Sequence, residues 1–144
     1  MARVVNAAFS RYQWYSPITV RDYANYLGYI EKRYKTLYLL AWSPSGELAG
    51  YLQAYINPNL AEGFSGYIEE VAVDPRYQGH GLGSSLVVKT ARRLYNETRH
   101  VYLNSVRGLE GFYEKLGFAI VDETVYYEAS LTLFPERAVT VYTG

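Results

Sequence analysis

The stretch Gln78-Gly79-His80-Gly81-Leu82-Gly83-Ser84 decides the fold that we expect for this chain. It follows a strand-like run, residues 67–73, and precedes a segment with the hydrophobic spacing of an amphipathic helix. Glycines let the backbone approach a ligand closely. The first N–H groups of a helix have no partners within the helix and favour negative charge. The stretch therefore predicts a site in which main-chain amides, rather than a basic side chain, hold a pyrophosphate group.

The positions of the glycines in this stretch can be compared with those of known phosphate-binding loops. A Walker loop carries Lys-Ser or Lys-Thr directly after its last glycine, whereas Gly83 is followed by Ser84 and the next lysine is Lys89. A dinucleotide fingerprint that began at Gly79 would require glycine at position 84, within repeated βαβ units. Both a nucleoside-triphosphate site and a Rossmann-type nucleotide-binding domain are therefore disfavoured.

Two motifs in this chain resemble one family. Gln78, Gly81 and Gly83 meet the pattern Q-x-x-G-x-G, and they follow Val71-Ala72-Val73-Asp74-Pro75. Here the sequence resembles the GNAT superfamily of acetyl-CoA-dependent N-acetyltransferases. A second block, Phe112-Tyr113-Glu114-Lys115-Leu116-Gly117-Phe118, resembles the second signature of that family, in which a tyrosine lies beside the CoA sulfur. The resemblance covers roughly residues 37–144 and implies the GNAT-like acyl-CoA N-acyltransferase fold.

Length and composition limit the remaining possibilities. With 144 residues, of which 49% are hydrophobic, the chain is expected to form a single domain over residues 1–144. Zero cysteines leave no thiolate metal site, and His80 and His100 are isolated, so we expect no metal. Fourteen basic residues balance fourteen acidic ones, which gives no general attraction to nucleic acid or membrane. No apolar run of membrane-spanning length occurs, and we expect a soluble, cytoplasmic protein.

Hydrophobic spacing and turn residues predict the order of the elements. They indicate α/β architecture, with a mixed, mostly antiparallel sheet flanked by helices. The predicted elements are a strand at residues 3–7, a helix at 20–34 capped by Thr19, strands at 37–42 and 48–56 joined by a hairpin turn, a loop at 57–65, a strand at 67–73, a helix at 82–94, a strand at 101–103, a helix at 109–116 closed by Gly117, and extended segments at 118–122, 125–133 and 138–142.

The resemblance also implies which residues bind the cosubstrate, acetyl-CoA. The backbone of Val71, Ala72 and Val73 would meet the thioester and the pantetheine arm. The pyrophosphate would lie on the glycine-rich stretch, made up of Gln78, Gly79, His80, Gly81, Leu82, Gly83 and Ser84. Asn104, just after the strand at 101–103, is expected to bond the pantetheine amides.

Three side chains are candidates for the chemistry of acetyl transfer to an amine. An alkylamine has a pKa near 10, so a base must take its proton, and Glu69 and Glu70 are the candidate bases. Neighbouring strand residues point to opposite faces, so we expect only one of them to face the acceptor. The resemblance favours Glu69, acting through a bridging water. It also implies that Tyr113 protonates the departing CoA thiolate.

The identity of the acceptor stays open at this point. The family shapes its acceptor site from regions that match residues 12–27 and 125–134, and both are rich in aromatic and poor in acidic residues. We therefore expect a small or peptide-borne amine without polycationic character. Seventeen tyrosines fit ordinary strand positions, an aromatic acceptor pocket or an oligomer interface such as a homodimer. A CoA-binding regulatory module without catalysis is the alternative function.

Overall fold

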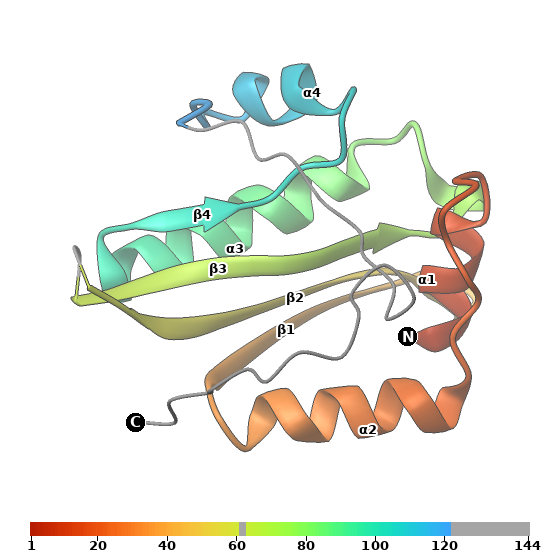
Figure 1. Cartoon of the computed structure of the whole chain (residues 1–144). Coiled ribbons are helices and arrows are strands. Elements are labelled where there is room, and N and C mark those ends of the chain that lie inside the picture. Colours follow the sequence, from red (N-terminus) through yellow and green to blue (C-terminus); the bar gives the residue numbers. More distant parts are fainter. Residues whose placement is uncertain (61–62, 122–144) are drawn as a thin grey trace, which may run out of the picture.

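The computed structural model describes residues 1–60 and 63–121 of the chain. Within these ranges a mixed sheet lies between helices (Figure 1). The elements in chain order are α1 (Ala2–Phe9), α2 (Val20–Glu31), β1 (Lys35–Trp42), β2 (Leu48–Asn59), β3 (Gly63–Val73), the 3₁₀ turn η1 (Pro75–Tyr77), α3 (Leu82–Thr98), β4 (Val101–Leu103) and α4 (Glu110–Lys115).

The four described strands lie in the order β1-β2-β3-β4. The β1–β2 and β2–β3 pairs are antiparallel, and β3 and β4 run parallel because α3 carries the chain back between them. Figure 1 shows α2 and α3 on opposite sides of the sheet. The predicted mixed, mostly antiparallel architecture is confirmed.

Each face of the sheet has its own hydrophobic core. On one face Tyr51 and Ala72 pack against α1 and α2, and on the other face Leu52 and Ile68 pack against α3. This division follows from the alternation of side chains along β2 and β3. Gly66 lets α3 approach closely, because a Cβ atom there would lie 2.7 Å from the Cβ of Leu94.

Two of the predicted elements are wrong. Residues 3–7 belong to α1 rather than to a strand, because Ala2, Val5 and Ala8 recur at helical spacing and bury one face of a helix. Residues 57–65 are not a loop throughout, since β2 and β3 continue to the pair Asn59 and Gly63 and leave a short connection.

The other elements stand close to their predicted positions. The Thr19 side chain accepts a hydrogen bond from the Asp22 N–H at 3.1 Å, which is the expected cap at the start of α2. Residues 118–121 form no strand, and the predicted segments at 125–133 and 138–142 lie outside the described residues.

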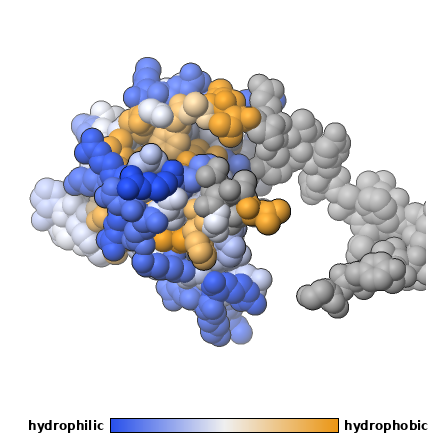
Figure 2. Space-filling view, turned by 90° about the vertical axis from the view of Figure 1, so that its left-hand side faces the viewer, coloured by the Kyte–Doolittle hydropathy of each residue, from blue (hydrophilic) through white to orange (hydrophobic). Residues whose placement is uncertain are grey.

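The surface of the described part of the chain mixes polar and apolar groups. Figure 2 shows hydrophobic side chains in separate groups between hydrophilic ones. Among residues 1–60 and 63–121, no helix is long and apolar enough to cross a membrane.

Candidate active site

The glycine-rich stretch joins β3 to α3 in the geometry of an anion cradle. Gly79 and Gly81 have φ values of +84° and +78°, a conformation that side chains rarely adopt. The first helical hydrogen bond of α3 runs from the Ser85 N–H to the Gly81 carbonyl at 3.0 Å. The N–H groups of Leu82, Gly83 and Ser84 precede that bond, so helix geometry leaves them without partners inside the helix. A helix of this length presents them as a site for negative charge.

The cradle opens into a cavity of about 730 Å³. Its lining includes all but two of the predicted site residues: Glu69, Glu70, Val71, Val73, Gln78, Gly79, Gly81, Leu82, Gly83, Ser84, Asn104 and Tyr113. Ala72 is 1% exposed, and its side chain packs in the core on the α1 side. His80 lines a separate, shallower hollow that also includes Trp42 and Ser85.

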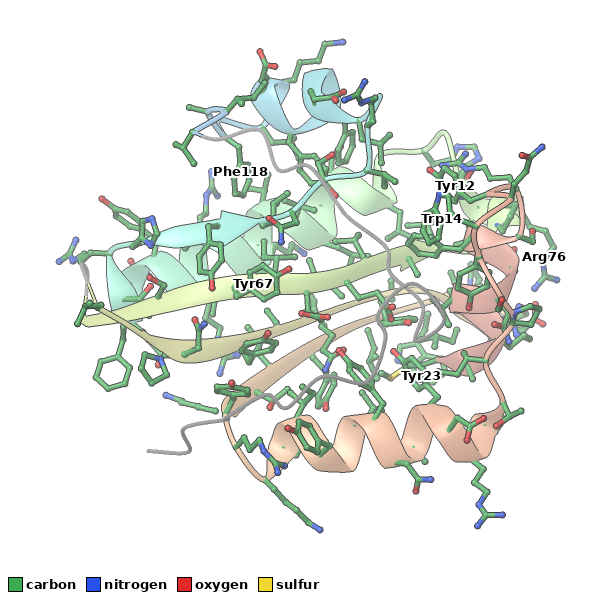
Figure 3. All side chains as sticks on the ribbon, viewed as in Figure 1. Tyr12, Trp14, Tyr23, Tyr67, Arg76 and Phe118 are labelled. Atoms are coloured by element: carbon green, nitrogen blue, oxygen red, sulfur yellow. The ribbon has the colours of Figure 1, made fainter. Side chains whose placement is uncertain are left out.

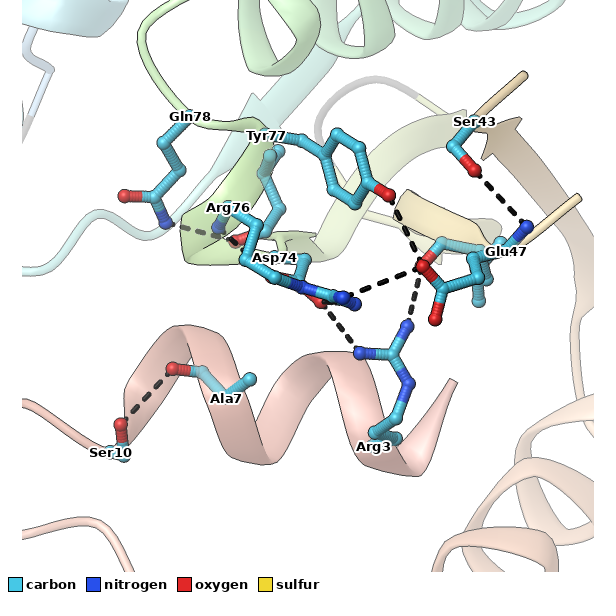
Figure 4. A network of polar contacts seen from close by, with 11 residues as sticks. Arg3, Ala7, Ser10, Ser43, Glu47, Asp74, Arg76, Tyr77 and Gln78 are labelled. Carbon is cyan, nitrogen blue, oxygen red and sulfur yellow. Dashed lines mark hydrogen bonds and ion pairs between the residues drawn. The ribbon is translucent and has the colours of Figure 1, made fainter. Parts of the chain in front are cut away.

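An ion-pair cluster fixes the turn before the cradle (Figure 4). The buried carboxylate of Asp74 accepts hydrogen bonds from Arg3 at 2.6 Å and from Arg76 at 3.0 Å. The hydrogen bonds from Arg76 hold the pKa of Asp74 well below its usual range against the opposing effect of burial, and Arg3 adds to them. The Gln78 amide donates to the Val73 carbonyl at 2.9 Å. Gln78 thus ties the entry of the cradle to the end of β3.

A β-bulge places both candidate glutamates on one face of the sheet. Gln53 of β2 lies opposite Glu70, whereas the next residue, Ala54, lies opposite Ile68, so Glu69 is the extra residue. Glu70 accepts from Tyr51 and Glu69 accepts from Tyr55 at 3.2 Å. Those tyrosines are four residues apart on β2 and share a face. The expectation that the two glutamates point to opposite faces of the sheet is therefore wrong, because the extra residue interrupts the alternation.

Tyrosine hydroxyls hold the carboxylate of Glu70. The Tyr51 hydroxyl donates to Oε1 of Glu70, and the Tyr23 hydroxyl lies 2.8 Å from the same oxygen and 2.7 Å from the Tyr51 hydroxyl. Burial raises the pKa of Glu70, the hydrogen bonds from Tyr51 and Tyr23 oppose that rise, and the charge of Glu69 adds to it. Glu70 is thus a rigidly placed carboxylate that accepts a proton more readily than an ordinary glutamate does.

Tyr113 lies on α4, across the cavity from the sheet. Its ring packs at a steep angle against Phe112 and Phe118, with centroids 5.0 and 6.0 Å apart. Burial raises the pKa of Tyr113, and the neighbouring Tyr12 adds to the effect, so its hydroxyl keeps its proton at neutral pH. Gly117, with φ of +101°, closes the helix in the predicted left-handed conformation.

Asn104 follows β4 and lines the cavity. Its amide donates to the Tyr67 hydroxyl at 3.3 Å, and the pairing of Leu103 with Ile68 places this end of β4 beside the middle of β3. Asn104 therefore belongs to the cavity wall, and its bond to the pantetheine amides stays a prediction.

The part of the cavity wall that α1 contributes was not predicted from the sequence, whereas most of the loop after α1 lies within residues 12–27, which the family resemblance assigned to the acceptor site. Val5, Ala8, Phe9 and Arg11 line the cavity, together with three further aromatic residues of the loop, Tyr12, Trp14 and Tyr15. Figure 3 shows Tyr12 and Trp14 on this loop, at the end of the sheet where β3 runs into η1. The helical spacing of Ala2, Val5 and Ala8 was the signal that could have placed this wall.

Comparison with known proteins identifies the family. Residues 4–118 match the Acetyltransferase (GNAT) family. The chain belongs to the GNAT acetyltransferase family. Its two motifs, at residues 78–84 and 112–118, are both part of the described structure, and the second motif reaches the last residue of the match.

Individual GNAT relatives agree with this assignment. A glucosamine 6-phosphate N-acetyltransferase of Trypanosoma brucei brucei is 37% identical over 78 residues, which are 52% of this chain and 53% of that protein. The match thus spans about half the length of that relative. A crystal structure of a Trypanosoma brucei acetyltransferase superposes with a TM-score of 0.69 at 24% identity, over 90% of this chain and 95% of that one. An aminoglycoside N-acetyltransferase in complex with CoA superposes with a TM-score of 0.61 at 17% identity, over 77% of this chain and 88% of that one.

Proposed function

We propose that this chain transfers the acetyl group of acetyl-CoA to a primary amine by direct attack. One observation carries the proposal: a single cavity runs from the amides of the cradle, past Val71 and Val73, to the carboxylates of Glu69 and Glu70 and the hydroxyl of Tyr113. A pyrophosphate site, a base and an acid therefore open onto one space. The family membership and the CoA complex of the aminoglycoside N-acetyltransferase support acetyl-CoA as the cosubstrate.

The residues of the cradle fit the diphosphate of CoA. Gly79 and Gly81 leave open space where a Cβ atom would stand, so the ligand can approach the backbone directly. The amides of Leu82, Gly83 and Ser84 at the start of α3 would bind the diphosphate oxygens. Bound there, acetyl-CoA supplies an activated acetyl group as a thioester. Asn104 would orient the pantetheine arm from the opposite wall.

Glu70 takes the proton of the acceptor amine in this proposal. A general base works best when its pKa lies near the working pH, and burial raises the pKa of Glu70 in that direction. Its position is also fixed by Tyr51 and Tyr23, which removes the need to order it during the reaction. Glu69, which the family resemblance favours, is the more exposed of the two and lies one residue farther from Val71. We assign it the attraction of the incoming ammonium group.

Tyr113 gives a proton to the CoA sulfur as the C–S bond breaks. An ordinary thiol has a pKa of about 8.5, so a neighbouring phenol that keeps its proton at neutral pH can supply it and prevent the reverse attack. The half-buried Tyr113 lines the cavity and meets this requirement.

Measurement of CoA binding and of thiol release separates this function from its alternative. The full chain should bind CoA in a titration and release free thiol from acetyl-CoA only when a primary amine is present. Tyr113→Phe should retain CoA affinity and lose turnover by about 100-fold or more. A regulatory module without catalysis would bind CoA and release no thiol with any amine. Absence of CoA binding would reject both functions.

A further inference from the structure

Four aromatic rings from one short segment form a wall of the cavity that the acetyl-transfer chemistry does not use. Phe9 lies at its centre, with ring centroids 5.8 Å from Tyr12, 6.2 Å from Trp14 and 5.6 Å from Tyr15. Tyr12 and Trp14 are stacked, with centroids 5.2 Å apart and an interplanar angle of 21°. Trp14 is 63% exposed, so its ring offers a large free surface. We call these four residues the aromatic wall.

The aromatic wall is held in a fixed position. The Asn6 side chain accepts from the Ile18 N–H at 2.9 Å and donates to the Ile18 carbonyl at 2.9 Å, which closes the loop after α1 at its base. The Tyr15 hydroxyl donates to the same Asn6 side chain at 2.6 Å. A ring surface that is ordered before binding loses little conformational entropy when a ligand stacks on it.

The aromatic wall borders the same cavity as the proposed base and the proposed acid. Burial raises the pKa of Tyr15, and the charge of Glu70 adds to the rise. Burial also raises the pKa of Tyr113, and Tyr12 adds to that rise. All four rings and both glutamates line one cavity. An amine placed at the glutamates would therefore direct its substituent across these rings.

The charges around the cavity favour a cation with an uncharged body. Among the described residues that line it, Glu69, Glu70 and Arg11 are the charged ones. The guanidinium of Arg11 is engaged by Tyr12, since it donates to the Tyr12 hydroxyl at 3.0 Å and lies 5.0 Å from the ring centroid. A phosphate on the acceptor would need several free donors, whereas the two carboxylates attract an ammonium group.

We propose that the acceptor is an arylalkylamine, in which a short chain joins a primary amine to an aromatic ring that stacks on Trp14 and Tyr12. This inference rests on the proposed acetyl transfer. The acceptor enters as an ammonium ion and loses two protons: one passes to Glu70 and frees the amine for attack, and the second leaves to water once the N–C bond has formed and the C–S bond has broken. Tyr113 gives a proton to the departing sulfur and regains one from Glu70 through solvent. The product is a neutral amide, which no longer attracts the carboxylates and can leave.

Thiol release from acetyl-CoA, measured with a set of amines, tests the inference. The set contains phenethylamine, tryptamine, propylamine, glucosamine 6-phosphate and spermine. We expect kcat/KM for phenethylamine and tryptamine to exceed that for propylamine by about ten-fold or more, because stacking and ring burial each favour the aryl group. Trp14→Ala should reduce this ratio several-fold, whereas Trp14→Phe should restore part of it.

The controls separate failure of this inference from failure of the proposed function. Tyr95→Ala removes a ring that is 50% exposed on α3, away from the cavity, and should leave the ratio unchanged. Equal kcat/KM for aryl and alkyl amines, preference for glucosamine 6-phosphate or spermine, or an equal loss for both amine types in Trp14→Ala would overturn the arylalkylamine assignment alone. If none of the amines in the set causes thiol release while CoA binding is intact, the result would count against acetyl transfer itself.

Discussion

Glu69 and Glu70 are consecutive in β3, yet both of their side chains lie on the face of the sheet that carries Tyr51 and Tyr55. Two carboxylates this close repel each other, and the tyrosine hydroxyls offset part of the repulsion. The bulge that brings them together thus places two negative charges at the proposed acceptor end of the cavity and gives the two groups different environments.

Substitution of each glutamate should give different kinetic results. Glu70→Gln should lower kcat by about 100-fold or more, because it removes the proposed general base. Glu69→Gln should mainly raise KM for the amine, since Glu69 is proposed to attract the ammonium group. Steady-state kinetics with saturating acetyl-CoA would show the two patterns. A larger loss of kcat in Glu69→Gln than in Glu70→Gln would transfer the role of base to Glu69.

Burial of Glu70 also predicts its effect on stability. When a carboxyl group has a higher pKa in the folded protein than in the unfolded chain, the folded protein loses stability as the pH rises between the two pKa values. The unfolded value for glutamate is about 4.3. Glu70→Gln should therefore have a melting temperature at neutral pH equal to or above that of the parent chain. Thermal melts at pH 4 and pH 7 would test this, and the advantage of the variant should shrink at the lower pH.

Tyr51→Phe should move the acid limb of the kcat/KM profile to higher pH. The hydrogen bond from Tyr51 lowers the pKa of Glu70 against the effect of burial, so its loss lets that pKa rise further. Because the base must be deprotonated to act, the loss of activity on lowering the pH would then begin at a higher pH than in the parent chain. Tyr55→Phe, which removes the contact to Glu69, is the matched control. An unmoved acid limb in Tyr51→Phe would show that another group sets it.

Gly83→Ala should lower the affinity for CoA without lowering the stability of the fold. The new Cβ atom would lie 3.7 Å from Val73 and 3.8 Å from Phe112, so the protein accommodates it without strain, but it narrows the cavity beside the cradle. Alanine in a helix is favoured over glycine by up to about 1 kcal/mol, so stability should rise slightly while CoA affinity falls several-fold. Gly28→Ala in α2, which meets no atom within 4 Å, should raise stability without changing CoA affinity.

Gly66→Ala should destabilise the fold by about 1 to 3 kcal/mol. A Cβ atom at position 66 would come within 2.7 Å of the Leu94 Cβ, and α3 would have to move away from β3. Urea denaturation would measure the change in the free energy of unfolding. Gly111→Ala introduces the same methyl group in α4, where no atom lies within 4 Å, and it should leave stability unchanged or raise it slightly.

The sequence predicted most of the fold because its periodicity was unambiguous where strands alternate with helices. The cap at Thr19, the helix after Gly81 and the closure at Gly117 followed from local residue chemistry. The strand predicted at residues 3–7 was wrong because burial against the sheet selects a helix there, with Ala2, Val5 and Ala8 in the core.

The glycine-rich cradle could be predicted because its function depends on backbone conformation encoded by adjacent residues. The position of the two glutamates could not be predicted, because a bulge depends on how two strands pair and has no signal in the sequence of either strand alone. For the same reason the hydrogen bonds of Tyr23 and Tyr51 to Glu70 were missed, since the donors come from α2 and β2. The assignment of the base therefore remains a prediction.

The bond between Arg3 and Asp74 has a consequence for how the two substrates are presented to each other. Arg3 belongs to the helix that leads into the aromatic wall, and Asp74 begins the turn that leads into the cradle. One ion pair thus connects the two ends of the cavity. A movement of α1 would therefore also move the turn before the cradle. In the proposed reaction, the spacing between the amine and the thioester would therefore depend on this ion pair.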